Sequence, residues 1–164
     1  MDACDNMRHV PYAPLVSSPL NCGTNRKSCP AHMEEEQKIG VIALIRDEYG
    51  KYLIVKRSDD LKYEPGKWAF VGGTVEFGEN PKNALKREVM EEVGIEISDI
   101  EILNIDHGTF LSVDRKIKRH SIHLSFLCKA ASDKIKINKE ITEFRWLIPK
   151  DISKLDLMKG NEKF

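Results

Sequence analysis

The sequence lacks any uninterrupted run of about 18 apolar residues, the length that a membrane-spanning helix requires. We therefore expect a soluble protein without a membrane partner. It also lacks an excess of charge of one sign, because 26 basic and 26 acidic residues give a formal net charge of zero at pH 7. Proteins that bind nucleic acid generally carry a surplus of Lys and Arg, so no nucleic-acid partner is expected. A small anionic substrate stays compatible with this composition, since it needs only a local site.

Cysteine is scarce, with four residues in the chain of 164. Cys4, Cys22 and Cys29 lie in the first 32 residues, whereas Cys128 falls within a strand-like pattern. Cys22 and Cys29 are separated by six residues, too many for the short knuckles of zinc sites, and four unevenly spaced cysteines make no disulfide framework. These absences favour a reducing, cytoplasmic setting and indicate that Cys128 is a small buried hydrophobic residue.

Two compositions meet near residue 32. Residues 1–32 hold four of the seven prolines and show no apolar periodicity, which predicts an extended or disordered tail. Three prolines interrupt the apolar stretch over 10–20, so no secretory signal is expected. Met33 is a candidate natural start, which would make the tail a vector-derived or upstream extension. Residues 33–164 are long enough for a single domain with its own core.

The pattern of this domain predicts a mixed α/β structure. A helix is expected over 81–93, because Asn80 suits its N-cap, Pro81 its first turn and Gly94 the left-handed position after its end. Alternating or continuous apolar residues predict a hairpin over 39–57 and strands over 68–71, 95–110, 120–130 and 143–147. A short final helix is expected over 149–157, opened by a proline.

The 81–93 helix carries the residues with the clearest chemistry. Glu88, Glu91 and Glu92 fall within an arc of about 100° beside an apolar stripe, so the stripe can pack on a sheet while the carboxylates face a cleft. A hard cation such as Mg²⁺ or Mn²⁺ would relieve the repulsion between these charges. A solvated acidic face paired with lysines is the alternative for the helix alone. The neighbouring Gly73 favours the metal site, because a glycine lets the backbone approach an ion.

Residues 73–95, GTVEFGENPKNALKREVMEEVGI, carry a fixed spacing of glycine, acidic, basic and aliphatic residues. The stretch resembles the signature G-x5-E-x7-R-E-U-x-E-E-x-G-U of the Nudix hydrolase family, in which U is a bulky aliphatic residue. The matching positions are Gly73, Glu79, Arg87, Glu88, Val89, Glu91, Glu92, Gly94 and Ile95. The similarity, which is to MutT-like members, extends over about residues 38–157 and leaves the tail outside.

This resemblance implies an α/β (α+β) fold, a Nudix-type α/β/α sandwich with a mixed β-sheet. It also implies hydrolysis of a nucleoside diphosphate linked to another group, with Mg²⁺ as cofactor and Mn²⁺ as a substitute. By matching position, Glu88 and Glu92 would be the main metal ligands. Glu91 would be a further ligand or would orient the water, and the Gly73 carbonyl would complete the set. Glu79 and Arg87 would support the loop and the catalytic helix.

The general base is left open by the sequence. Glu88 and Glu91 are candidates within the signature, and Glu140 and Glu143 are acidic candidates further along the chain that would also lie near the substrate. Members of the family differ in this residue.

Within the family, the sequence is most similar to nucleoside triphosphatases that convert pyrimidine deoxynucleotides to the monophosphate and pyrophosphate. The alternatives are a pyrophosphatase acting on nucleotide sugars or ADP-ribose and, outside enzymes, a nucleotide-sensing module without turnover. The proline and tyrosine typical of ADP-ribose hydrolases are missing at 109–111, which disfavours that substrate. The family resemblance also makes a homodimer a candidate assembly.

Candidate substrate contacts follow from side-chain chemistry. Arg57 suits a phosphate, and Phe70 or Phe110 suits stacking on a base, although a surface ion pair and core aromatics are the plainer interpretations. The basic segment 115–120 is either a phosphate contact or a solvated hairpin tip. The three histidines His107, His120 and His123 show no metal-ligand spacing, and no role is assigned to them.

Overall fold

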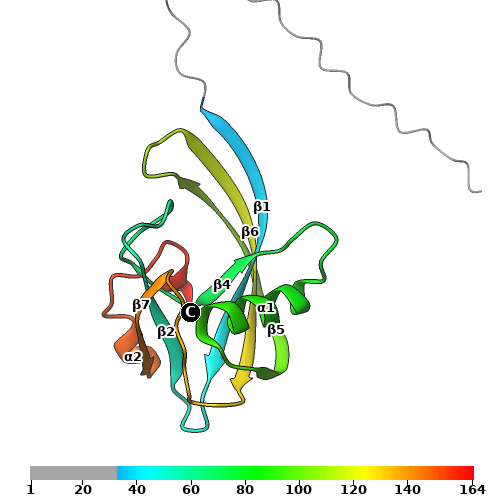
Figure 1. Cartoon of the computed structure of the whole chain (residues 1–164), viewed down its shortest axis with the longest axis vertical. Coiled ribbons are helices and arrows are strands. Elements are labelled where there is room, and N and C mark those ends of the chain that lie inside the picture. The colour runs from blue at the N-terminus through cyan, green and yellow to red at the C-terminus, as the bar shows by residue number, and fades with distance from the viewer. Residues whose placement is uncertain (1–32) are drawn as a thin grey trace, which may run out of the picture. The chain divides into compact units, whose positions relative to one another are not determined.

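The computed structural model describes residues 33–164. Along the chain these residues form β1 (Glu34–Arg46), β2 (Tyr52–Arg57), β3 (Trp68–Ala69), β4 (Val71–Thr74), α1 (Pro81–Val93), β5 (Ile97–Leu111), β6 (Ile117–Ala130), β7 (Ile141–Leu147), α2 (Pro149–Ile152) and a 3₁₀ turn (Asn161–Lys163) (Figure 1). The expectations for residues 1–32, including their three cysteines, lie outside the described residues. No helix within 33–164 is long and apolar enough to cross a membrane.

The strands join in one seven-stranded mixed sheet in which β1 and β2 each pair with three other strands. The main order is β3-β2-β1-β6-β5, with β4 pairing β1 and β7 pairing β2. β1 and β6 run parallel, and the other pairs are antiparallel. The predicted 39–57 hairpin forms only next to its turn, where Arg46 pairs with Tyr52. Further from the turn, residues 40–43 of β1 pair with residues 71–74 of β4 instead of with β2.

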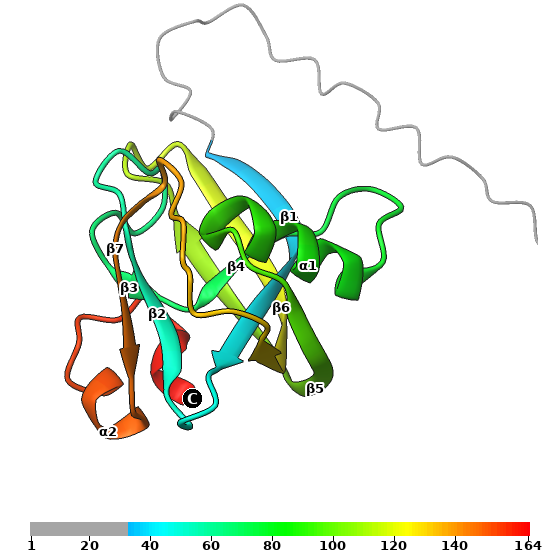
Figure 2. The ribbon, with the colours of Figure 1, turned by 60° about the horizontal axis from the view of Figure 1, so that its bottom comes forward.

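Alternation along β1 and β2 divides the core between the two faces of the sheet. One cluster contains Val41, Ala43, Ile45, Leu53 and Val55 together with the buried stripe of α1, Ala84, Leu85, Val89 and Val93. The other contains Leu44, Ile54, Trp68, Phe70 and Ile152 of α2. Because both sides of these strands are buried, helices cover both faces, and the fold is the α/β/α arrangement with a mixed sheet that the sequence predicts. Figure 2 shows α1 lying across one face, with α2 beside β7.

The boundaries of α1 agree with the predicted 81–93. The side chain of Asn80 accepts a hydrogen bond from the backbone N–H of Lys82 at 2.9 Å, and Pro81 occupies the first turn. Gly94 adopts a left-handed conformation with φ of 68°, and its N–H donates to the carbonyl of Met90. These local signals fix the helix on the sheet with Leu85 and Val89 turned inward.

Two predicted elements differ from the structure. The strand expected over 68–71 is split into β3 and β4 at Phe70, since β3 pairs with β2 and β4 pairs with β1. The helix expected over 149–157 ends at Ile152. The chain beyond it pairs with β3 instead, because the N–H of Trp68 donates to the Asp156 carbonyl at 3.0 Å and the N–H of Met158 donates to the Trp68 carbonyl at 2.7 Å.

β1 begins at Glu34, earlier than the predicted residue 39, because its acidic start pairs with the basic segment of β6. Glu35 accepts from Lys118 at 3.3 Å, and Glu36 accepts from Arg119 Nε at 2.7 Å. Much of the positive charge of the 115–120 segment is therefore engaged across strands. The turn between β5 and β6 lies at 112–116, and the rest of the segment belongs to β6, where Arg119 also lines a cavity, so a phosphate contact by this segment stays a prediction.

Candidate active site

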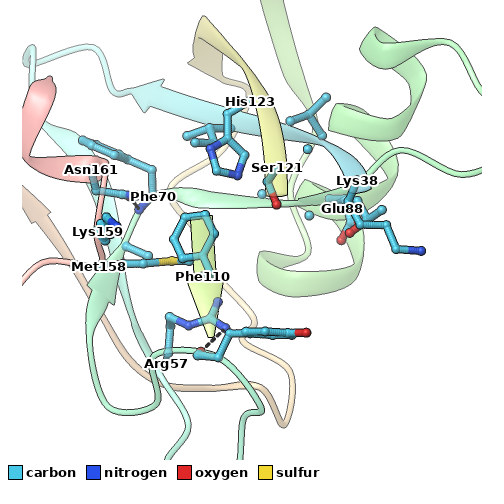
Figure 3. A pocket seen from close by; sticks show the side chains of 18 of the residues that line it. Lys38, Arg57, Phe70, Glu88, Phe110, Ser121, His123, Met158, Lys159 and Asn161 are labelled. Carbon is cyan, nitrogen blue, oxygen red and sulfur yellow. Dashed lines mark hydrogen bonds between the residues drawn. The ribbon is translucent and has the colours of Figure 1, made fainter. Parts of the chain in front are cut away.

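A cavity of about 340 Å³ opens beside α1, between the β1–β4 pair and the C-terminal segment. Glu88 and Lys38 lie toward one end of it (Figure 3). His123, Phe110, Met158 and Asn161 gather toward the other. The cavity thus has an acidic end and a second end lined by aromatic, amide and imidazole groups. Its volume lies near the lower limit of about 300 Å³ for small-molecule sites.

The acidic end depends on two glycines of β4. A Cβ atom at Gly73 would lie only 2.2 Å from Cδ of Glu88, and one at Gly72 would lie 2.1 Å from the carbonyl oxygen of Val41. Only glycine therefore lets the strand run directly against the Glu88 carboxylate and against β1. The N–H of Gly72 donates to Oε2 of Glu92 at 3.2 Å. The double glycine brings backbone polar groups next to both carboxylates.

Burial disfavours the charged form of both carboxyl groups, Glu88 and Glu92. Burial raises the pKa of Glu92 to about 8, and the nearby negative charge of Glu88 adds to the effect. The pKa of Glu88 is also raised, chiefly by burial, while its hydrogen bond from Arg87 acts in the opposite direction. Two carboxyl groups one helical turn apart thus share a site that disfavours their charged forms.

Arg87 cross-links the loop over 75–80 to α1. Its Nε and Nη2 donate to the two carboxylate oxygens of Glu79 at 3.0 Å each, and Nη2 also donates to the Thr74 carbonyl at 3.1 Å. Its Nη1 donates to Glu88 at 3.0 Å and to Glu91 at 3.3 Å. The hydrogen bonds with Glu79 lower the pKa of that carboxyl group and raise the pKa of the guanidinium. This bidentate pair fixes the loop against the helix.

The donor set suits a hard divalent cation. Glu88 and Glu92 supply carboxylate oxygens where burial has raised their pKa, so a cation placed between them offsets the cost of their charge. Among residues 33–164, no three His, Cys, Asp or Glu side chains converge into a ligand cage. Mg²⁺ does not need one, since it is commonly held by one or two carboxylates together with water and substrate phosphates.

The acidic candidates for the base occupy different places. Glu140 lines the cavity, and its negative charge contributes to the raised pKa of Glu88 and Glu92. Glu143 is not part of the cavity lining and instead forms an ion pair with Arg145 Nη2 at 2.6 Å. Glu91 also lies outside the lining, with 57% of its side chain exposed and its carboxylate paired to Arg87. The structure therefore brings Glu140, but neither Glu143 nor Glu91, to the cavity.

Arg57 reaches the cavity from the end of β2. Its Nη2 donates to the carbonyl of Tyr63 at 3.0 Å, and its Nε donates to the carbonyl of Glu64 at 3.3 Å. Burial lowers the pKa of this guanidinium, while the negative charges of Glu92 and Glu140 act in the opposite direction. Arg57 therefore holds the 58–66 loop and carries positive charge beside the acidic end.

The two aromatic candidates differ in their surroundings. Phe70 lies in the core cluster with Trp68, and its ring makes an edge contact with Phe164 at 5.8 Å between centroids. Its ring is therefore mostly packed in the core, but it also lines the cavity, so stacking of Phe70 on a base stays a prediction. Phe110 lines the cavity, with its ring 5.7 Å from that of His123.

Several cavity residues were missed by the sequence interpretation. His123, to which no role was assigned, lies on the face of β6 opposite to the apolar Leu124 and Phe126. The alternation of side chains along the strand already placed His123 on this face. Met158 and Asn161 had no such signal, because they follow α2 in a segment without apolar periodicity. The position of this segment depends on long-range contacts such as the hydrogen bond from the Phe70 N–H to Oδ1 of Asn161 at 2.8 Å.

Comparison with known proteins identifies relatives of this chain by sequence. Residues 36–164 match the family described as NUDIX domain. The chain is 37% identical over 132 residues to proteins named nucleoside triphosphatase NudI from Escherichia coli O17:K52:H18 and from Shigella sonnei. Each alignment covers 77% of this chain and 93% of the relative.

Solved structures give the same relationship. A MutT protein from Methanosarcina mazei superposes with a TM-score of 0.62 and 28% identity over 79% of this chain and 90% of its own. The NUDIX domain of NrtR from Shewanella oneidensis, solved with ADP ribose, superposes with a TM-score of 0.63 and 18% identity, covering 78% of this chain and 83% of its own. At that identity the second likeness concerns the fold alone.

Proposed function

The chain belongs to the Nudix family of hydrolases, which act on pyrophosphate bonds and use a divalent metal, and from this we propose that its substrate is a nucleoside triphosphate. The products are the nucleoside monophosphate and pyrophosphate. The preferred substrates are pyrimidine deoxynucleotides, and the metal is Mg²⁺.

One observation carries this proposal. The cavity joins two buried carboxylates at one end to a recess lined by Phe110, His123 and Asn161 at the other. The acidic end suits a metal-bound phosphate chain, and the second end suits a flat polar base. The name of the NudI relatives supports a triphosphate as substrate.

We assign the metal to Glu88 and Glu92, with the Gly73 carbonyl as a further oxygen donor. When bound, Mg²⁺ neutralises charge on the phosphate oxygens and lowers the pKa of the attacking water. Arg87 and Glu79 hold these ligands in place through the loop and helix contacts described above. Arg57 adds positive charge toward the phosphates, and Glu91 supports the helix face through Arg87.

Glu140 is our choice for the general base. It lines the cavity near the two metal-ligand carboxylates. Its backbone carbonyl accepts from the Ser58 N–H at 2.8 Å, and its own N–H donates to Oδ1 of Asn138 at 2.9 Å. Glu88 is engaged with Arg87 and the metal, and Glu143 lies outside the cavity. Glu140 is thus the carboxylate left free to accept the proton of the attacking water.

A panel of nucleotides tests the proposal. The full chain is incubated with Mg²⁺ and each of dCTP, dTTP, dUTP, dATP, dGTP, UDP-glucose and ADP-ribose, and the products are resolved by chromatography. We expect pyrophosphate and monophosphate from the pyrimidine triphosphates at the highest kcat/KM. Turnover of UDP-glucose or ADP-ribose alone would contradict the proposed substrate, and equal rates with Mg²⁺ and with EDTA would contradict the proposed metal.

A further inference from the structure

His123 is an unusual residue on the cavity wall. It follows Ser121 on the same face of β6, and its ring points toward the cavity with Phe110 and Asn161 nearby (Figure 3). Phe110 meets this ring at 5.7 Å between centroids and at 62°. No hydrogen bond joins the imidazole to another of the side chains drawn at the cavity. A half-buried ring therefore faces the place where a ligand would lie.

The backbone opposite His123 is adapted to the ring. β1 places Gly40 at the position paired with His123, and a Cβ atom there would lie 2.8 Å from Cδ2 of the imidazole. Any larger residue at 40 would push the ring from its position. On the other side, β5 pairs Asp106 with His123, and the Asp106 carboxylate is already bound to Lys163. The strands β1 and β5 on either side thus hold the imidazole in place.

Burial also determines the form of this ring. Burial lowers the pKa of His123, and the opposing effect of Asp106 is smaller. At neutral pH the imidazole is uncharged, with one nitrogen that donates a hydrogen bond and one that accepts. Such a group is suited to the edge of a nucleobase, where N–H donors and carbonyl or ring-nitrogen acceptors lie side by side.

The surrounding wall is polar and incompletely satisfied. A recess of about 70 Å³ continues past His123 and is also lined by Asn161 and Ser125. Oγ of Ser125 is fully buried and has no hydrogen-bond partner within residues 33–164. The Oδ1 atom of Asn161 accepts from Phe70 N–H, which orients the amide group and leaves its N–H donors available. Buried polar groups of this kind are normally satisfied by protein, water or ligand, so this end of the cavity can accept a polar ligand.

We propose that His123 is a specificity-determining residue, whose imidazole hydrogen-bonds the edge of the substrate's base at a position kept open by Gly40. The proposal rests on the proposed function, because it requires a nucleotide as substrate. Glu88 and the phosphates of the proposed function lie toward the other end of the cavity, and the proposal assigns only the base to His123. Its removal therefore weakens the enzyme's preference for one base without affecting the chemistry.

The test compares substrates with and without a base. Wild type, His123→Leu, His123→Gln and the matched control His120→Leu are assayed with the four deoxynucleoside triphosphates and with 1,2-dideoxyribose 5-triphosphate, which has no base. His120 lies on the other face of β6, against His107 at 5.5 Å. Thermal unfolding of each full-length variant verifies that it is folded.

We expect His123→Leu to lower kcat/KM for the preferred nucleotide at least about tenfold while changing it less than about twofold for the base-free substrate. His123→Gln, which keeps a donor and an acceptor, restores part of the preference, and His120→Leu changes neither value. Equal losses on the nucleotide and the base-free substrate would overturn the proposal, because they indicate a structural or catalytic role. Unchanged preference among the four bases would overturn it as well.

A second measurement separates this proposal from the proposed function. The ¹⁵N chemical shifts of the imidazoles are recorded in EDTA while dCMP, dTMP, dAMP or dGMP is added, with His123 assigned from the His123→Gln spectrum. Base-dependent shifts of the His123 nitrogens support the proposal even when no triphosphate is hydrolysed. Absence of such shifts at saturating monophosphate would refute it, whatever the enzyme hydrolyses.

Discussion

At the scale of single residues, Glu92 carries the sharpest conflict between burial and charge. Burial and the neighbouring charge of Glu88 raise the pKa of its carboxyl group to about 8. The hydrogen bond that it accepts from the Gly72 N–H acts in the opposite direction and is the smaller effect. An uncompensated buried carboxylate destabilises a fold unless it is protonated or paired. When a cation binds next to this carboxylate, the negative charge is offset and its burial no longer destabilises the fold.

Glu92→Gln provides the first prediction. The amide keeps the size of the side chain but supplies no charge to a cation, so we expect kcat to fall at least about a hundredfold in Mg²⁺. The melting temperature in EDTA should not fall, because the amide resembles the protonated acid. Glu96→Gln, an exposed acid just beyond α1, is the control and should retain wild-type kcat. Near-normal turnover by Glu92→Gln would exclude the metal assignment.

The raised pKa of Glu92 also predicts how stability depends on pH. Between the ordinary carboxyl value of 4.5 and about 8, the folded protein retains a proton that the unfolded chain has lost. The free energy of unfolding in EDTA therefore falls as pH rises through this window. We expect the melting temperature to fall by ~5 °C or more, and expect Mg²⁺ or Glu92→Gln to flatten the slope. A melting temperature that rises over the same window would contradict the raised pKa.

At the scale of elements, the loop and helix over 73–95 work as one unit. Local signals determine this unit, since Asn80, Pro81 and Gly94 set the ends of α1 and the fixed spacing of acids sets its face. That is why the helix and the acidic end were predictable from sequence. The split of the strand at Phe70 and the early end of α2 were not, because each depends on pairing with a strand distant in the chain.

Arg87→Lys tests the connection between loop and helix. A lysine keeps the charge but cannot donate two parallel hydrogen bonds to Glu79, so the 75–80 loop loosens. We expect kcat/KM to fall by about tenfold or more and the free energy of unfolding to fall by about 1–2 kcal/mol. Lys86→Gln, one position earlier and exposed, serves as control in urea titrations and kinetic assays. A result in which both variants match wild type would show that the cross-link is dispensable.

At the scale of the whole molecule, the cavity combines segments far apart in sequence. The carboxylates Glu88 and Glu92 and the double glycine of its acidic end come from one continuous stretch, whereas Gly40, Phe110, His123 and Asn161 are contributed by β1, β5, β6 and the C-terminal segment. Motif spacing can describe the first kind of site. The second kind requires the strand register, which is why His123 and Asn161 escaped the sequence interpretation.

Deletion of residues 1–32 tests the predicted domain boundary. All the contacts described for the core and the cavity lie within 33–164, so we expect the shortened chain to keep kcat/KM within about twofold and to lose less than about 1 kcal/mol of stability. Steady-state kinetics and urea unfolding of the two chains give the comparison. A large loss of either quantity would assign residues 1–32 a part in the domain.

The position of β1 has a consequence for how activity is acquired during folding. Residues 40–43 pair with β4 on one side and with β6 on the other, so the same four residues align Gly73 and His123. The pairing with β6 closes a long loop, since Glu36 and Arg119 lie 83 positions apart. Pairing across such a separation is slow, because the entropy of loop closure is lost before the contacts form. Both ends of the cavity therefore form when β1 pairs with β6, late in folding. A refolding chain should gain nucleotide binding and turnover together.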